Sequence, residues 1–225
     1  MSQIGDPESF VKALSFALRD DQVRASLTDI VGESFRQEIA FLKAELKRKD
    51  GEIVVLQRGA DTLVSRTDSL EQYTRRNSLR LTGLSETDNE DILKRTVDIM
   101  NNKMKVEPPL SANDIDRVHR VGRRDASKPR SVIIKFTSYR ARHIAMRHRK
   151  NLKMNLPSTF LNEDLTKERS VLLYKARTMK RQGHIQDCWT HDGAIVLKDK
   201  AGKIHSARNV MDGDNLLASL TKPQA

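Results

Sequence analysis

The stretch EQYTRRNSLRLTGLSE, residues 71–86, changes its apolar period halfway along. Upstream of it, apolar residues recur every three or four positions, whereas within it Leu79 and Leu81 alternate with polar residues. The first spacing is typical of an amphipathic helix and the second of a half-buried strand. Between them lies the joint, residues 75–77, which contains two adjacent arginines and no Gly or Pro. The stretch therefore predicts a helix that passes directly into a strand.

A heptad of apolar residues runs through residues 35–77 without a skipped step. Six consecutive heptads in register favour a coiled coil, because a 3.5-residue repeat keeps one seam facing a partner helix. One chain cannot bury this seam alone, so self-association is expected. The predicted seam residues, at a and d positions, are Phe35, Ile39, Leu42, Leu46, Ile53, Leu56, Leu63 and Leu70.

Several features qualify this prediction. A lone amphipathic helix packed on its own domain is the alternative interpretation. Lys49 at a d position and two nearby glycines weaken the middle of the seam. Ile at a positions with Leu at d positions favours a parallel dimer. Upstream, residues 1–34 form a short helical region, in which two short amphipathic helices over 8–31 are expected to break near Asp20.

Downstream of the joint, residues 78–163 have the pattern β-α-β-β-α-β. The first helix is expected to begin at a capping box of Thr87 and Glu90, and the second to cover 139–153. This order is that of ferredoxin-like domains, a group that includes RNA-recognition modules. Strands are expected at 78–84, 114–121, 130–138 and 158–164.

Residues 164–215 predict a small α+β C-terminal domain, followed by a tail over 216–225. Its helix is expected to be capped by Thr166 and to end at Gly183. Three strands should follow, at about 185–190, 194–199 and 203–207. The whole chain is thus predicted to be α+β with an N-terminal coiled coil.

Charge is distributed unevenly along the chain. The net charge is +11, but residues 1–34 carry −3, residues 35–74 carry 0 and residues 75–225 carry +14. Within the last part, residues 117–153 hold 13 basic side chains and the single acid Asp125. Such a density predicts binding to a polyanion. A solvated basic face that binds nothing is the alternative.

The sequence gives little support to catalysis or metal binding. It contains no Gly-rich phosphate loop, and the paired acids Glu163 and Asp164 directly precede a helix start, where the dipole favours negative charge. His184, Cys188 and His191 lack a fourth zinc ligand. We therefore expect no enzyme activity, no cofactor and no metal.

Aromatic residues are scarce where sequence-specific RNA-recognition modules need them. The third predicted strand offers only Phe136, and the first offers none, so sequence-specific base readout on the usual aromatic platform is not expected. Trp189 is predicted to lie in the core of the C-terminal domain rather than to form a stacking platform. Phosphate contacts by Arg and Lys remain, and these provide affinity with little sequence discrimination.

The segments SLEQYTRRNSLRLTGLSE, DRVHRVG, KPRSVIIKFTS and LNEDLTKERSVLL resemble the nucleic-acid-binding protein encoded by the first open reading frame of LINE-type retrotransposons. The C-terminal domain also resembles the baculoviral few-polyhedra (FP) protein. The resemblance covers about residues 35–215. It implies a coiled-coil homotrimer that binds RNA and single-stranded DNA as a nucleic-acid chaperone, with arginines of the joint touching the nucleic acid. A trimer is therefore favoured, with a dimer as the alternative.

Charge and resemblance together predict a non-enzymatic ribonucleoprotein component without a small-molecule substrate. One runner-up is an FP-like packaging factor that acts through protein partners, and the other is a coiled-coil DNA-binding regulator. With one cysteine, no long apolar run and no signal-peptide pattern, an intracellular protein away from membranes is expected, cytoplasmic with nuclear as the alternative. The predicted nucleic-acid-binding residues are Arg75, Arg76, Arg117, Arg120, Arg130, Lys135, Arg140, Arg142, Arg147, Lys150, Lys153, Lys167, Arg177 and Arg181.

Overall fold

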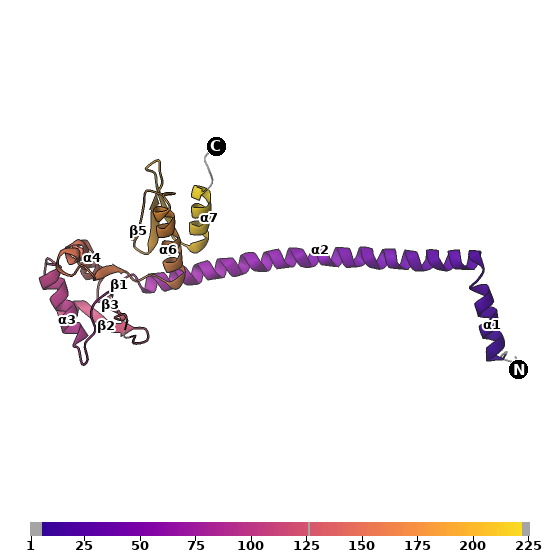
Figure 1. The fold of residues 1–225 in the computed structure, drawn as a ribbon, viewed down its shortest axis with the longest axis horizontal. Helices are drawn as coiled ribbons and strands as arrows, with labels where there is room; N and C mark the ends of the chain where they lie inside the picture. Colours follow the sequence, from indigo (N-terminus) through magenta and orange to yellow (C-terminus); the bar gives the residue numbers. More distant parts are fainter. Residues whose placement is uncertain (1–5, 126, 222–225) are drawn as a thin grey trace. The chain divides into compact units, whose positions relative to one another are not determined.

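A computed structural model describes residues 6–125 and 127–221 of the chain. The residues fall into two compact units, which divide after Asp61. Figure 1 shows two helices, α1 and α2, followed by the elements of two α+β domains. Within the described ranges, no helix combines the length and hydrophobicity that a membrane crossing requires. The α+β class with a long N-terminal helix is confirmed.

The N-terminal region differs in part from the prediction. Helix α1 spans Pro7–Ala17, and α2 spans Asp21–Thr74, 54 residues without interruption. The break near Asp20 is confirmed, since its carboxylate accepts the backbone N–H groups at the start of α2. The second short helix is instead continuous with the long one, because a single glycine, Gly32, costs only about 1 kcal/mol inside a helix.

Helix α2 is compatible with a coiled coil. The eight predicted seam residues are all exposed in the single chain, from 49% at Ile39 to 71% at Leu56. Asp50 and Gly51 do not interrupt the helix. A stripe of large apolar side chains along so long a helix is typical of helices that pair with another helix.

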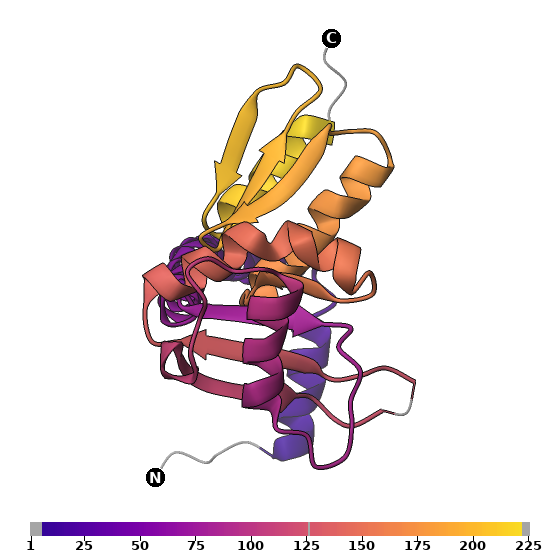
Figure 2. The ribbon, with the colours of Figure 1, turned by 90° about the vertical axis from the view of Figure 1, so that its left-hand side faces the viewer.

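The sheet domain, residues 78–163, contains four strands in the order β2-β3-β1-β4, with every pair antiparallel. Helices α3 and α4 pack against this sheet, and α3 lies across it in Figure 2. The strands are β1 (Ser78–Thr82), β2 (Ile115–Val121), β3 (Ser131–Phe136) and β4 (Phe160–Glu163). The helical segments are α3 (Ile92–Asp98) with the π-helix Ile99–Lys103, the 3-10 turn Ala112–Asp114, α4 (Tyr139–Arg147), the 3-10 turn His148–Asn151 and α5 (Leu152–Asn155).

The core of the sheet domain follows from the alternation of its strands. Leu79 and Leu81 are almost fully buried and face the helices, whereas Arg80 between them faces away. Phe136 is also buried in this core, at 1% exposure. The opposite face of the sheet therefore lacks this phenyl ring.

The predicted capping box at the first helix of this domain is wrong. Helix α3 begins at Ile92, and Asp91 is its N-cap, with a carboxylate that accepts the Lys94 N–H at 3.0 Å. Glu90 instead forms ion pairs with Arg95 and Arg120. Two guanidinium groups bind a carboxylate more strongly than one backbone N–H does.

The C-terminal domain contains α6 (Lys167–Arg181), β5 (Asp187–His191), β6 (Ala194–Lys198), β7 (Ile204–Ala207) and α7 (Val210–Thr221). Thr166 caps α6 as predicted, and Gly183 follows its end with φ +73°. The domain extends past the expected boundary at residue 215, because Leu217 of α7 is buried in its core. A Cβ on Gly213 would lie 2.2 Å from Leu172, so glycine permits this close helix packing.

Candidate nucleic-acid interface

The two arginines of the joint have different environments. Arg75 donates from Nη1 to the Asp164 carboxylate at 3.1 Å and from Nη2 to Glu71 at 2.6 Å. Arg76 is exposed, and its guanidinium lies 4.0 Å from the centre of the Tyr73 ring. Arg75 is thus held by protein carboxylates, whereas Arg76 remains accessible to a ligand.

The end of α2 is anchored to the segment that joins the two domains. Asp68 and Gln72 are buried, although they occupy outward-facing b and f positions of the heptad. Gln72 donates to the Asp164 carbonyl at 3.1 Å and accepts the Thr166 N–H at 3.0 Å. Asp68 accepts from Arg169 Nε at 2.7 Å. The seam residue Leu70, on another side of the helix, stays 69% exposed.

Arg142 connects the sheet domain to the C-terminal domain. Its guanidinium contacts Glu163 at 2.5 Å and Asp192 at 2.9 Å, and only 5% of its side chain is exposed. Glu163 also accepts the backbone N–H groups of Asp192 and Gly193. Arg142 was predicted to contact nucleic acid, but the structure places it in a buried network between domains.

Two further predicted residues are engaged in ion pairs at one end of the sheet. The Arg120 side chain is 5% exposed and pairs with Glu90, because it points from β2 toward the helices. Arg130 pairs with Glu86. Its guanidinium, hydrogen-bonded to Glu86, lowers the pKa of that carboxyl from 4.5 to about 2. Sequence reasoning could not separate these arginines from the free ones, since the acids that pair with them lie 30 to 44 positions away.

The lowered pKa of Glu86 should make the stability of the fold depend on pH. A carboxylate with a lowered pKa in the folded state stabilises the fold above its ordinary pKa, and this contribution disappears as pH falls from 4.5 toward about 2. Glu86→Gln should therefore lower the urea midpoint at pH 7 and have little effect at pH 2. Urea unfolding of both proteins across this range measures the difference. A midpoint difference that does not vary with pH would contradict the prediction.

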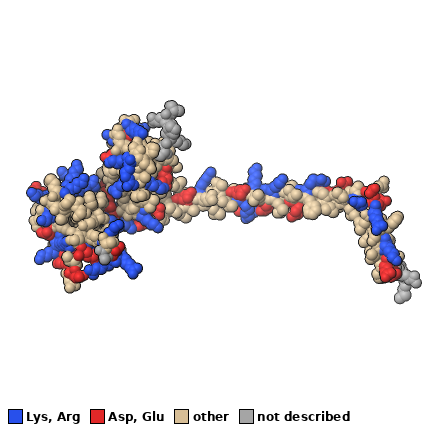
Figure 3. Space-filling view, in the orientation of Figure 1, with Lys and Arg blue, Asp and Glu red and all other residues tan. Residues whose placement is uncertain are grey.

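Most of the other predicted cations are free to bind a ligand. Lys135 pairs with Asp116 at 3.2 Å, although both side chains are about half exposed, and Arg181 lies near the Tyr174 ring. Lys and Arg side chains are spread over both domains on the face drawn in Figure 3. Nine of the predicted cations are exposed and form no ion pair with a carboxylate in the described part of the chain: Arg76, Arg117, Arg140, Arg147, Lys150, Lys153, Lys167, Arg177 and Arg181.

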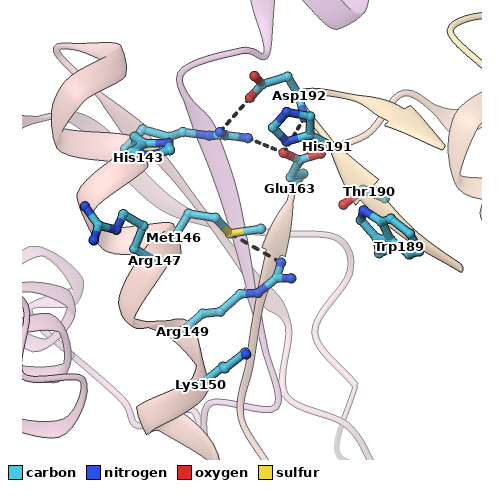
Figure 4. Close-up of a pocket in the computed structure, with 11 residues that line it drawn as sticks. His143, Met146, Arg147, Arg149, Lys150, Glu163, Trp189, Thr190, His191 and Asp192 are labelled. Atoms are coloured by element: carbon cyan, nitrogen blue, oxygen red, sulfur yellow. Dashed lines mark hydrogen bonds and ion pairs between the residues drawn. The ribbon is translucent and has the colours of Figure 1, made fainter. Parts of the chain in front are cut away.

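A groove of about 290 Å³ lies between α4 and β5, and we call it the Trp189 groove. Arg147, Arg149 and Lys150 come from the helical side, and Trp189 comes from β5 (Figure 4). The carboxylates in its lining, Glu163 and Asp192, are both engaged by Arg142. The remaining lining residues are His143, Met146, Thr190 and His191.

Trp189 was predicted to be a core residue, and the structure contradicts this. Cys188 packs against the core of the C-terminal domain, so the next side chain on the strand points to the opposite face of the sheet. Trp189 is consequently half-buried in the wall of the groove. The alternation along β5 was the signal in the sequence that could have revealed its position.

No protein-family model and no curated protein matches this chain. A function for this chain must therefore be inferred from its own residues, and the Trp189 groove is the best candidate among them. Cations without acid partners attract a polyanion, and an indole beside them can stack on a planar ring.

The three possible zinc ligands of the sequence do not form a cluster. Within residues 6–125 and 127–221, no group of three or more His, Cys, Asp or Glu side chains is placed to hold a metal ion. Burial raises the pKa of the Cys188 thiol, which disfavours the thiolate that zinc requires.

Proposed function

We propose that this chain is a non-enzymatic protein that binds RNA or single-stranded DNA with little sequence preference. The observation that carries this proposal is the Trp189 groove, where cations without carboxylate partners on the helical side face a half-buried indole on β5 (Figure 4). Phosphates bind Arg147 and Lys150, and an unpaired base stacks on Trp189. A duplex keeps its bases stacked on one another, so a single strand uses this combination better.

The fold supports an RNA-recognition-like assignment for the sheet domain. Its strand order, β2-β3-β1-β4, accompanies the element order of the split β-α-β motif. The aromatic residues that such modules use on β1 and β3 are missing from the described strands, since Phe136 faces the core. Binding would then depend on the groove and on basic side chains more than on the sheet face.

We further propose that α2 assembles several chains, with a trimer favoured over a dimer. An oligomer multiplies the number of grooves that one nucleic-acid strand can occupy, which raises avidity without new contacts. Together with the resemblance to LINE-type first-open-reading-frame proteins and to FP, this supports a role as a nucleic-acid chaperone in a cytoplasmic or nuclear retroelement ribonucleoprotein.

Filter binding with single-stranded RNA, single-stranded DNA and duplex DNA tests the proposal. If six or more phosphates are contacted, affinity for RNA should fall by about 10³ or more between 50 and 200 mM salt. Scrambled RNAs should bind equally well. Tighter binding to duplex DNA would support the DNA-binding regulator instead, and no binding to any of the three would favour the FP-like packaging factor.

A charge-matched pair of variants locates the site. Arg147→Ala with Lys150→Ala removes two groove cations, and Lys12→Ala with Lys47→Ala removes two exposed cations from α1 and α2. The groove variant should lose at least about tenfold in RNA affinity and reduce the salt slope by about one per lost contact. Equal losses from both variants would mean that only net charge matters.

A further inference from the structure

A second hollow, of about 410 Å³, adjoins the Trp189 groove, and we call it the Phe160 hollow. Arg149 and Lys150 line both. The volume falls within the range of about 300–1,000 Å³ that is typical of small-ligand pockets. The other lining residues are Lys153, Thr159, Phe160, Leu161 and Asn162.

The strand β4 presents an aromatic ring and an amide to this hollow. Leu161 and Glu163 are buried, so the intervening side chains, Phe160 and Asn162, point outward from the strand. Phe160 is 47% exposed. β4 is the edge strand of the four-stranded sheet formed by the described residues.

The positive charge around the ring distinguishes it from an ordinary exposed apolar residue, which needs no explanation by itself. Lys150 and Lys153 are exposed and pair with no carboxylate in the described residues. Among the described residues, Arg149 donates only to the Met146 sulfur, at 3.6 Å. A ligand that suits this site has a flat face for the phenyl ring and a negative charge for the cations, as a nucleotide has.

We propose that Phe160 is a second base-stacking platform. One base of a single strand stacks on Trp189 and a neighbouring base stacks on Phe160, while Arg149 and Lys150 bind phosphate between them. Asn162 has both a donor and an acceptor for the edge of the second base. This inference rests on the proposed function, because it extends the same binding site by one hollow.

Fluorescence anisotropy with the full-length protein tests this, using oligo(dT) and an abasic oligonucleotide of the same length. Phe160→Ala should weaken oligo(dT) binding about 5- to 150-fold, the range for loss of one stacked base. The salt slope should not change, because no charge is removed. Affinity for the abasic strand should not change either, and Phe160→Tyr should retain oligo(dT) affinity.

Phe16→Ala is the matched control, since Phe16 is 80% exposed in α1. Unchanged oligo(dT) binding by Phe160→Ala would overturn the stacking platform but leave the proposed function intact. Equal losses on the normal and abasic strands would also overturn it, since Phe160 would then act on the fold. If the unmodified protein binds neither oligonucleotide, the proposed function fails as well.

Discussion

Replacing Asp68 by Ala should destabilise the C-terminal domain by about 3–5 kcal/mol, because it leaves a buried guanidinium without its counter-charge. Arg169 and Asp68 have side chains only 7% and 4% exposed, and their ion pair measures 2.7 Å. Arg169 also donates to the Gly193 carbonyl, and Asp68 accepts from the Thr166 hydroxyl. Removal of the Asp68 carboxylate therefore breaks its contacts with Thr166 and Arg169 at the start of α6. It also weakens the hold of Arg169 on Gly193 in the β5–β6 turn.

Trp189, the single tryptophan, reports on this domain during urea unfolding at fixed protein concentration. Asp214→Ala is the control, because it removes an exposed partner of Lys175 and should cost less than about 1 kcal/mol. The double variant Asp68→Leu with Arg169→Met should recover most of the stability, since a buried apolar pair can replace an ion pair. Equal effects from Asp68→Ala and Asp214→Ala would show that the buried pair is dispensable.

Leu56→Asp combined with Leu63→Asp should convert the proposed oligomer into monomers. Both residues are d positions of the proposed seam, and they are 71% and 64% exposed in the single chain. Burying each leucine between chains contributes about 1.5–3 kcal/mol per chain. Carboxylates at the same positions would instead be buried next to one another, which favours separation.

Sedimentation equilibrium at micromolar concentration measures the mass. Phe41→Asp with Val55→Asp is the control, because both side chains are exposed at c positions on the outer face of the helix. The control should keep the mass of the unmodified protein, which we expect to be a trimer. A dimer mass would revise only the number of chains, whereas a monomer mass for the unmodified protein would contradict the coiled coil.

Local pattern was sufficient to predict the order of the helices and strands in most of this chain. The heptad predicted α2, the alternation of Leu79 and Leu81 predicted β1, and Thr166 marked the start of α6. Such features depend on neighbouring residues, so a single sequence contains them. Helix α7 was missed because its short apolar pattern becomes decisive only when α6 offers a surface to pack on.

The roles of the arginines could be determined only by the tertiary structure. Arg75 and Arg76 are adjacent and chemically identical, yet Asp164, 89 positions from Arg75, engages one and not the other. Arg120 and Arg142 were likewise indistinguishable in sequence from Arg117 and Arg147, and folding placed only the first two beside buried acids. A guanidinium binds whichever carboxylate comes within about 3 Å. That distance is set by long-range packing rather than by neighbours in the chain. Composition was therefore sufficient to predict a basic surface, whereas only the tertiary structure determined which of its cations have no carboxylate partner.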